Sequence, residues 1–341
     1  MELLALDENF NPIRYLNYIN LQWDRAYYEC GTFSVRLSAS EYSSDIAYLY
    51  TKDRPETGIA QKVLYETTIK GAFVQISGFF LEHILNDKII YPTYYASGNL
   101  ETAIRAMIAR YKADIPLLTL GAAQGLGTAV TWQETGGAMD TVCYTALQTQ
   151  ALSLRCRYVL TENKIYFEVW QGIDRTQDQT ANNFVTFSRG FGNLQQATVD
   201  SDRSNAKNFA LVAGSGEGAA RITQEVDCSN GSYRQKIFVD AKSIAYDPDK
   251  QTLAAYKESL VQKGLEELLK YQNIFNVDVT VNATQFAYMT DFDLGDKIDI
   301  IIDDIGIALT ARIIAVHEVI KNGAHIVNLE IGDKIINRKR G

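Results

Sequence analysis

The amino-acid sequence predicts a mainly β fold of the α+β class: two small antiparallel β-barrels with an α/β domain inserted between them. The 341 residues include 20 Tyr and 14 Phe but only 5 Pro, a composition that favours strands. Short alternations of apolar and polar residues, separated by turn residues, occupy both ends of the chain. The middle of the chain instead has segments with apolar residues at helical spacing, which predicts the α/β insertion.

Residues 1–95 are predicted to form the first barrel. In the segment 31–37, Phe33, Val35 and Leu37 alternate with polar residues, as in a strand with one buried face. The other elements expected here are strands at 59–65 and 72–77, a hairpin turn at Lys70-Gly71 and a loop at 54–58.

Residues 96–206 and 246–272 are predicted to form the α/β domain. Asn99 can cap a helix that extends to Tyr111, because an Asn side chain accepts a hydrogen bond from the first N–H groups of a helix. The further elements expected are helices at 140–154 and 252–271, strands at 158–160 and 164–170, and a turn at 161–163.

Residues 207–245 and 273–341 are predicted to form the second barrel, with strands at 209–213, 220–226 and 233–239 and strand character over the last seventy residues. A weak internal repeat relates this region to the first barrel. The segments 66–72 and 318–324 share an E-x-x-x-x-G-A spacing between two apolar strands. Because any hairpin can place Gly in its turn, ordinary turn chemistry is the alternative to a duplication.

Charge and cysteine content exclude several classes of protein. The net charge is −8, whereas proteins that bind nucleic acid usually carry a basic surface. Cys30, Cys143, Cys156 and Cys228 include no C-x-x-C pair, so we expect buried reduced thiols and neither a zinc site nor a disulfide scaffold. The first residues lack the apolar stretch of a signal peptide, and no apolar run approaches the roughly 18 residues of a membrane span.

Two glycine-rich segments have the composition of nucleotide-binding loops but lack the following helix or the glycine spacing that such loops need. Gly214-Ser215-Gly216-Glu217-Gly218 follows a strand, yet residues 220–226 alternate like a second strand and supply no helix N-terminus for a phosphate. The segment 121–127 also lacks the spacing of a dinucleotide or P-loop motif. Both segments are interpreted as connections without a ligand.

His317 and His325 flank the hairpin expected near residue 322 and could approach each other across its strands. No third ligand stands at metal spacing, so we do not predict a metal site there. No motif for a serine or cysteine nucleophile is present. The sequence therefore offers no residue that we predict to be catalytic, to bind a cofactor or to ligate a metal.

A run of carboxylates near the end of the chain has two interpretations. The run comprises Asp291, Asp293, Asp296, Asp299, Asp303 and Asp304. Its spacing does not match a calcium-binding loop, and a solvated strand edge is favoured. Two of these carboxylates could instead form the acid–base pair of a glycoside hydrolase. The basic tail Arg338-Lys339-Arg340 is expected to be solvated.

An ordered set of segments resembles a known family. The segments are 6–13, Trp23-Asp24-Arg25, Gly31-Thr32-Phe33, 57–90, 167–176, 185–188, 208–221 and 291–299 with its Leu-Gly-Asp. Together they span almost the whole chain. They resemble the tail-hub proteins of long-tailed bacteriophages and of phage-tail-like bacteriocins, specifically the siphovirus ReqiPepy type of tail protein, which is similar to the central hub of contractile-tail baseplates.

The resemblance implies two barrels with an α/β insertion, assembled as a homotrimer whose six barrels form a ring of pseudo-sixfold symmetry. It implies a structural hub at the tail tip or baseplate, in a virion or phage-tail-like particle assembled in the bacterial cytoplasm. The implied partners are tail tube or distal tail proteins, spike or fibre proteins, and DNA or a tape-measure protein passing through the channel. No enzyme activity, catalytic residue or cofactor is implied.

Two further expectations accompany the hub, and two alternatives to it remain. The negative charge would let a channel wall repel phosphates, and Trp23, Tyr27 and Tyr28 are expected as interface contacts. A tail-borne glycan or peptidoglycan hydrolase that uses the carboxylates 291–304 is the alternative from the enzyme class. A host-surface carbohydrate-binding protein is the alternative among binding modules.

Overall fold

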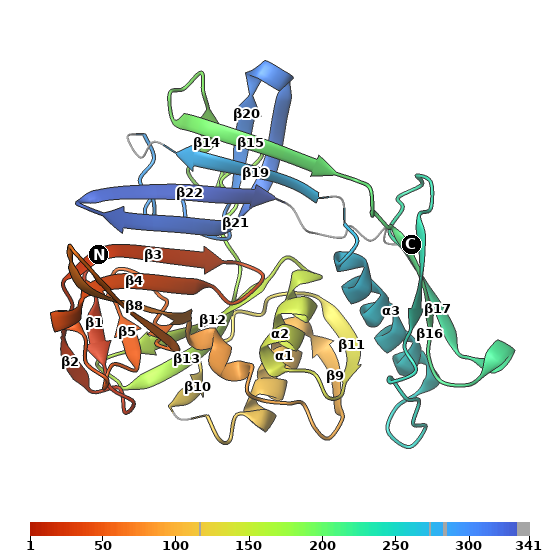
Figure 1. The fold of residues 1–341 in the computed structure, drawn as a ribbon. Helices are drawn as coiled ribbons and strands as arrows, with labels where there is room; N and C mark the ends of the chain where they lie inside the picture. Colours follow the sequence, from red (N-terminus) through yellow and green to blue (C-terminus); the bar gives the residue numbers. More distant parts are fainter. Residues whose placement is uncertain (116, 273, 282–284, 333–341) are drawn as a thin grey trace.

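An antiparallel sheet that runs through both halves of the chain dominates the computed structural model (Figure 1), which describes residues 1–115, 117–272, 274–281 and 285–332. Its strands lie in the order β7-β8-β4-β3-β21-β22-β19-β15. Their bounds are β3 Tyr18–Ala26, β4 Thr32–Ser38, β7 Lys62–Thr68, β8 Gly71–Phe79, β15 Leu194–Asp202, β19 Ile274–Val281, β21 Ile307–Lys321 and β22 Ala324–Gly332. The halves meet where β3 pairs with β21. The basic tail at 338–340 lies outside the described residues.

The first half of this sheet has the alternation that the sequence predicts. Phe33, Val35 and Leu37 of β4 are buried, and they share a core with Trp23 of β3. A second sheet in the order β2-β1-β5-β6 lies beside them; its strands are β1 Leu4–Leu6, β2 Pro12–Tyr15, β5 Tyr48–Tyr50 and β6 Gly58–Ile59. The strand expected at 59–65 is therefore two strands, β6 and β7.

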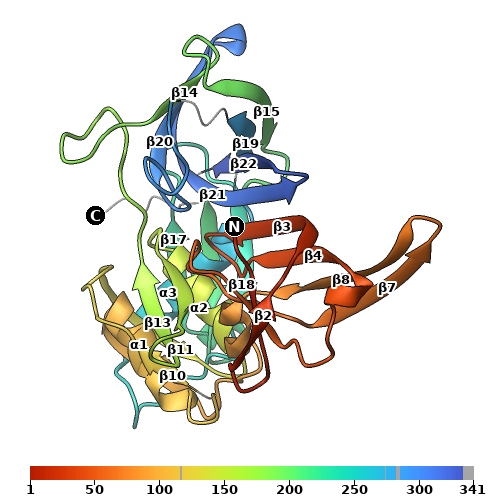
Figure 2. The same ribbon diagram turned by 90° about the vertical axis from the view of Figure 1, so that its left-hand side faces the viewer.

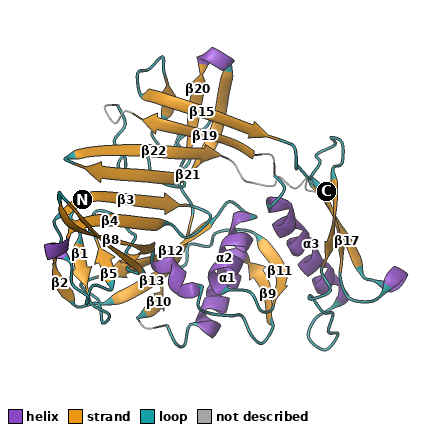
Figure 3. Cartoon of the chain, in the orientation of Figure 1, coloured by secondary structure: helices purple, strands orange, loops and turns teal. Residues whose placement is uncertain are grey.

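The second half of the sheet branches at the long strand β21. The first part of β21 pairs with β20 (Lys297–Ile302), which also pairs in parallel with β14 (Thr186–Ser188). Phe187, Phe292 and Ile298 belong to the core of this half. The mainly β fold class is confirmed, and strands dominate the molecule in Figure 3. The closure of each half into a barrel stays a prediction.

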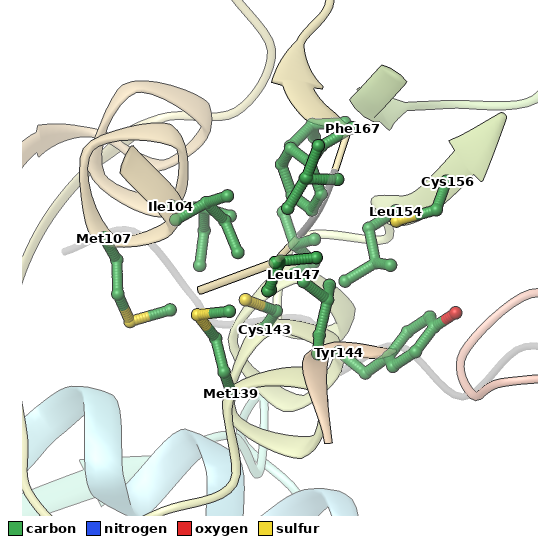
Figure 4. Close-up of a cluster of buried hydrophobic side chains, with 14 of the residues drawn as sticks. Ile104, Met107, Met139, Cys143, Tyr144, Leu147, Leu154, Cys156 and Phe167 are labelled. Atoms are coloured by element: carbon green, nitrogen blue, oxygen red, sulfur yellow. The ribbon is translucent and has the colours of Figure 1, made fainter. Parts of the chain in front are cut away.

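The middle of the chain forms the α/β portion. Its elements are β9 Tyr94–Asn99, α1 Leu100–Tyr111, β10 Leu118–Leu120, β11 Ala129–Glu134, α2 Met139–Gln148, β12 Ser153–Val159 and β13 Lys164–Trp170. The cap at Asn99 is confirmed, because its side chain accepts a hydrogen bond from the Thr102 N–H at 3.2 Å. Figure 4 shows the shared core, where Ile104 and Met107 of α1 face Cys143 and Leu147 of α2.

The helix predicted over 140–154 is too long. It ends at Gln148, and Ala151 adopts a left-handed backbone with φ of 58° before β12 begins. Leu154, Cys156 and Tyr158 then alternate toward the core. Leu147, Ala151 and Leu154 stand at helical spacing as well, so the apolar pattern fits either structure at this point.

A separate unit contains β16 (Phe209–Ala213), β17 (Thr223–Asp227), β18 (Lys236–Asp240) and α3 (Leu253–Leu269). The three strands form their own sheet, one face of which shares a core with α3. Figure 1 shows α3 between this sheet and β11. Thr252 caps α3 by accepting a hydrogen bond from the Ala255 N–H at 3.2 Å. The domain boundaries drawn from the sequence stay a prediction.

The two segments of the predicted repeat both form two-residue hairpins, but with different registers. Thr68 pairs with Gly71 in the β7–β8 hairpin, whereas Lys321 pairs with Ala324 in the β21–β22 hairpin. Gly71 is thus the first residue of a strand, and Gly323 is a turn residue. The two hairpins occupy equivalent positions in the two halves of the sheet, but the E-x-x-x-x-G-A segments are shifted by one residue relative to each other when the hairpins are aligned.

Candidate assembly interface

A buried ionic network holds the two halves of the long sheet together at the β3–β21 seam. Arg25 of β3 is 2% exposed, and its Nε donates to Glu56 Oε1 at 2.8 Å. Its Nη1 donates to Asp293 Oδ1 at 2.5 Å and to the Tyr288 hydroxyl at 2.7 Å. Asp293 and Tyr288 come from the second half of the chain and Glu56 from the first. One guanidinium therefore ties together segments more than two hundred residues apart.

Glu318 of β21 completes this network from the other side of the seam. Its carboxylate is wholly buried, and it accepts hydrogen bonds from two nitrogens of Arg54, with Nε at 2.7 Å from Oε1. His325 Nε2 lies 2.9 Å from Oε2. Burial alone would raise the pKa of Glu318, but the hydrogen bonds from Arg54 and His325 outweigh burial and lower the pKa to about 2. The carboxylate is ionised at neutral pH.

The run of carboxylates is partly a structural anchor, and the prediction of a solvated strand edge is wrong for Asp296. This side chain is buried and accepts hydrogen bonds from Arg175 Nε and the Ile173 N–H, both at 2.7 Å. Because Arg25 holds Asp293 in the same way, both carboxylates are occupied by a guanidinium. Asp303 and Asp304 are exposed, but they lie in the short 3-10 turn between β20 and β21 and not on a strand edge.

The two ends of the long sheet are exposed edge strands. Every residue of β7 is exposed, including Val63 at 47% and Tyr65 at 61%. Figure 2 shows the β7–β8 hairpin projecting from the body of the molecule. At the opposite end, β15 is exposed over most of its length. Within the described residues each of these strands pairs on one side only, so its other edge presents backbone N–H and C=O groups that a further strand could bind.

One face of the sheet, called the polar face below, carries polar side chains on all eight strands, beside a few exposed apolar ones such as Leu64 and Ile326. The cross-strand hydrogen bonds on it are Arg36–Glu66, Gln75–Ser34, His317–Asp24, Asn276–Glu330 and Thr280–Asn328. The register and the period of two place the carboxylates Asp24, Glu66, Asp200, Asp202, Asp278 and Glu330 on this face, together with the cations Arg36, Lys62 and Lys321. Carboxylates outnumber the permanent cations, so the face is acidic.

The glycine-rich segments are connections, as predicted. Gly214 to Gly218 lies in the turn between the antiparallel strands β16 and β17. The segment 121–127 wraps around a buried carboxylate of the protein itself: Glu101 of α1 accepts the N–H groups of Gln124 at 2.9 Å and Leu126 at 2.7 Å. The loop therefore surrounds an internal anion in place of a phosphate.

The remaining predicted residues are distributed as follows. His317 and His325 contact different carboxylates, Asp24 and Glu318. No group of three or more His, Cys, Asp or Glu side chains in the described ranges could hold a metal ion. The expectation that Trp23 and Tyr27 are interface contacts is wrong, since both are fully buried.

All four cysteines are reduced thiols; Cys143 and Cys156 are buried, whereas Cys30 and Cys228 are partly exposed. Sequence reasoning missed the seam residues Arg25, Arg54 and Glu318. Their partners lie far away along the chain, and no local pattern marks them. Over the part of the chain that the structure describes, no helix has the length and apolar character to cross a membrane.

Comparison with solved structures places this fold among tail proteins. A tail protein of Neisseria meningitidis MC58 superposes with a TM-score of 0.62 at 13% identity, covering 97% of this chain and 95% of that one. The 43 kDa tail protein of prophage MuSo2 from Shewanella oneidensis gives 0.59 at 10% identity, covering 98% and 99%. Prophage tail protein gp18 of Listeria monocytogenes EGD-e gives 0.56 at 13% identity, covering 98% and 95%.

At these identities the superpositions establish the fold. None of the curated proteins compared with the chain matches it. The family model of the siphovirus ReqiPepy6 Gp37-like proteins matches residues 5–333, which is nearly the full length of the chain. This match shows to which family the chain belongs, whereas the superpositions show only that the fold is similar. The chain with the continuous eight-strand sheet and its two open edges thus belongs to the siphovirus ReqiPepy6 Gp37-like family of tail proteins.

Proposed function

We propose that this structural tail protein is a hub of the tail tip or baseplate, in which three copies form a ring of pseudo-sixfold symmetry between the tail tube and the spike or fibre region. The observation that carries the proposal is that each chain already contains two sheet halves joined head to tail. The contact between the halves joins two different strand edges, so one edge of each kind is left at the ends of the chain's sheet. When the same contact forms between successive copies, the copies can close into a ring.

The two halves correspond strand by strand. Reading across the sheet, one row of paired residues is Leu64–Gln75–Arg36–Asn20, and the matching row is His317–Asn328–Thr280–Gln196. β7 thus corresponds to β21, and β3 corresponds to β15. Inside the chain, β3 of the first half pairs with β21 of the second half. If the same contact is repeated between copies, β15 of one copy pairs with β7 of the next.

The correspondence also gives a register for the contact between copies. The seam pair Gln22–Val319 becomes Thr198 opposite Glu66. Likewise, the pair Ala26–Ala315 becomes Asp202 opposite Lys62, an ion pair between the two edges. On the other face Val199 lies opposite the exposed ring of Tyr65. The exposed residues of both edges therefore complement each other when the seam is repeated.

Cross-linking tests this arrangement. In a chain carrying Thr198→Cys and Glu66→Cys, the two new thiols stand opposite each other between copies, within the Cα separation that a disulfide spans. Mild oxidation is expected to give covalent dimers and trimers on a denaturing gel. The matched control carries Thr198→Cys and Thr67→Cys, whose side chains point to opposite faces of the sheet, and it is expected to remain monomeric on the gel.

The proposal is contradicted if both pairs cross-link equally or if neither does in an assembled sample. Each single-cysteine chain serves to subtract cross-links made through Cys30 and Cys228, the two partly exposed native thiols.

The acidic face supports a channel in the proposed ring. In this arrangement the face that carries Asp24, Asp200 and Glu330 lines the passage, so that DNA or a tape-measure protein passes without adhering. Partners at the two ends would be tail tube or distal tail proteins and spike or fibre proteins. A similar fold in the Francisella PdpA-VgrG complex, with a TM-score of 0.50 and 12% identity over 98% of this chain and 52% of that one, supports a role beside other components of such an assembly.

We propose a structural role without catalysis, in a virion or a phage-tail-like particle such as a bacteriocin, where the hub contributes to host attachment by positioning the spike or fibre. Against a hydrolase that uses the carboxylates 291–304 stands the pairing of Asp293 and Asp296 with buried or partly buried guanidinium groups. A general acid for glycoside cleavage needs a carboxyl group that reaches the substrate.

A further inference from the structure

A pocket of about 370 Å³ opens where residues 8–10 and Tyr48 of β5 meet residues 84–88, 114–117 and Ile165 of β13. Its described lining residues do not belong to β7, to β15 or to the polar face of the long sheet. Its apolar lining comes from the side chains Phe10, Tyr48, Ile84, Ile115, Leu117 and Ile165. The Phe10 and Tyr48 rings stack with centroids 4.0 Å apart, which gives the pocket a rigid aromatic wall. Its volume lies in the range of pockets that hold side chains or small ligands.

The rim of this pocket is acidic. Glu8, Asp87 and Asp114 line it, and Lys88 is the cation among them, 3.7 Å from Asp114. The turn that carries Glu8 is held by Asp7, whose carboxylate accepts the N–H groups of Asn9 and Asn11, both at 2.8 Å. The part of the rim that carries Glu8 is therefore pre-formed, and carboxylates exceed cations on the rim as a whole. An apolar interior beneath an acidic rim complements a ligand that is apolar at its end and positively charged beside it.

We propose that this pocket binds a segment of a partner protein in which an apolar side chain stands next to Lys or Arg. The apolar side chain enters between Phe10 and Ile115, and the neighbouring cation lies at Glu8 and Asp87 on the rim. Burial of the apolar group supplies most of the binding free energy, and the carboxylates select the basic neighbour. This site is independent of the contact between β7 and β15, so it functions in a ring or in a single copy.

The test uses two labelled hexapeptides, Ac-Gly-Ile-Arg-Ile-Arg-Gly-NH2 and Ac-Gly-Ile-Glu-Ile-Glu-Gly-NH2, titrated with the purified full chain by fluorescence anisotropy. The arginine peptide is expected to bind at least about tenfold more tightly than the glutamate peptide, with an affinity that falls as salt is raised. Glu8→Gln combined with Asp87→Asn is expected to reduce the affinity for the arginine peptide about tenfold. Ile84→Trp, which fills the interior, is expected to abolish binding.

The control for the lost charges is Asp249→Asn with Glu258→Gln, two exposed carboxylates outside the pocket, which should leave the affinity unchanged. Circular dichroism spectra confirm that every variant is folded. Equal binding of the two peptides, or full affinity in the Ile84→Trp chain, would overturn the proposal. Failure of the arginine peptide to bind at millimolar concentration would overturn it as well.

Discussion

A chain carrying Lys62→Glu and Tyr65→Asp is expected to lose self-association while remaining folded. Both residues are exposed on β7, so the isolated chain loses little from the substitutions. In the proposed contact the first change places a carboxylate opposite Asp202, and the second places a carboxylate against Val199. Like charges and an unpaired buried charge both oppose association. We expect the association between copies to weaken by at least about a hundredfold.

Sedimentation velocity of the double variant, with its thermal melting curve, checks this expectation. Lys62→Arg combined with Tyr65→Phe retains the charge and the ring, and it should sediment as the parent chain does. If the charged double variant still sediments with the parent species, the β7 edge is not the contact between copies.

Glu318→Gln is expected to lower the free energy of unfolding by about 3–5 kcal/mol, the cost of removing one partner from a buried ion pair. Glu318 is fully buried, and Arg54, at 10% exposure, keeps its charge when the carboxylate is removed. Urea denaturation of the full chain measures the change. Asp304→Asn, which removes the exposed partner of Arg189, is the control and should shift stability by less than about 0.5 kcal/mol. Equal shifts would mean that the seam network does not stabilise the fold.

The pH dependence of this contribution follows from the depressed pKa of Glu318, about 2 in the folded chain against 4.5 as its ordinary value. Because the folded state holds the proton less tightly, the stabilisation is complete above pH 4.5 and is lost as the pH falls toward 2. The Glu318→Gln chain lacks this group. The stability difference between the two chains should therefore shrink over that interval, as measured by urea denaturation at successive pH values.

Local patterns allowed much of the fold to be predicted. The alternation of Phe33, Val35 and Leu37 identified β4, and the cap at Asn99 identified the start of α1. Prediction failed where one pattern fits two structures, as at Ala151, whose left-handed backbone ends the helical path before β12. Aromatic content likewise does not distinguish core from interface, and Trp23 proved to be core.

The seam itself could not be predicted, because its specificity resides in contacts between distant residues. Arg25 and Asp293 are separated by 268 positions, and Arg54 and Glu318 by 264. Each is an ordinary charged residue in its local sequence. The acidic run was misjudged for the same reason: the burial of Asp296 depends on Arg175, which lies 121 residues away.

Native mass spectrometry of the purified full chain tests the central claim most directly. The pairing of β15 with β7 around a closed ring predicts a dominant species with three times the mass of one chain. In the Lys62→Glu and Tyr65→Asp chain that species should give way to single copies. A parent chain that remains a single copy at every concentration examined would contradict the proposed ring.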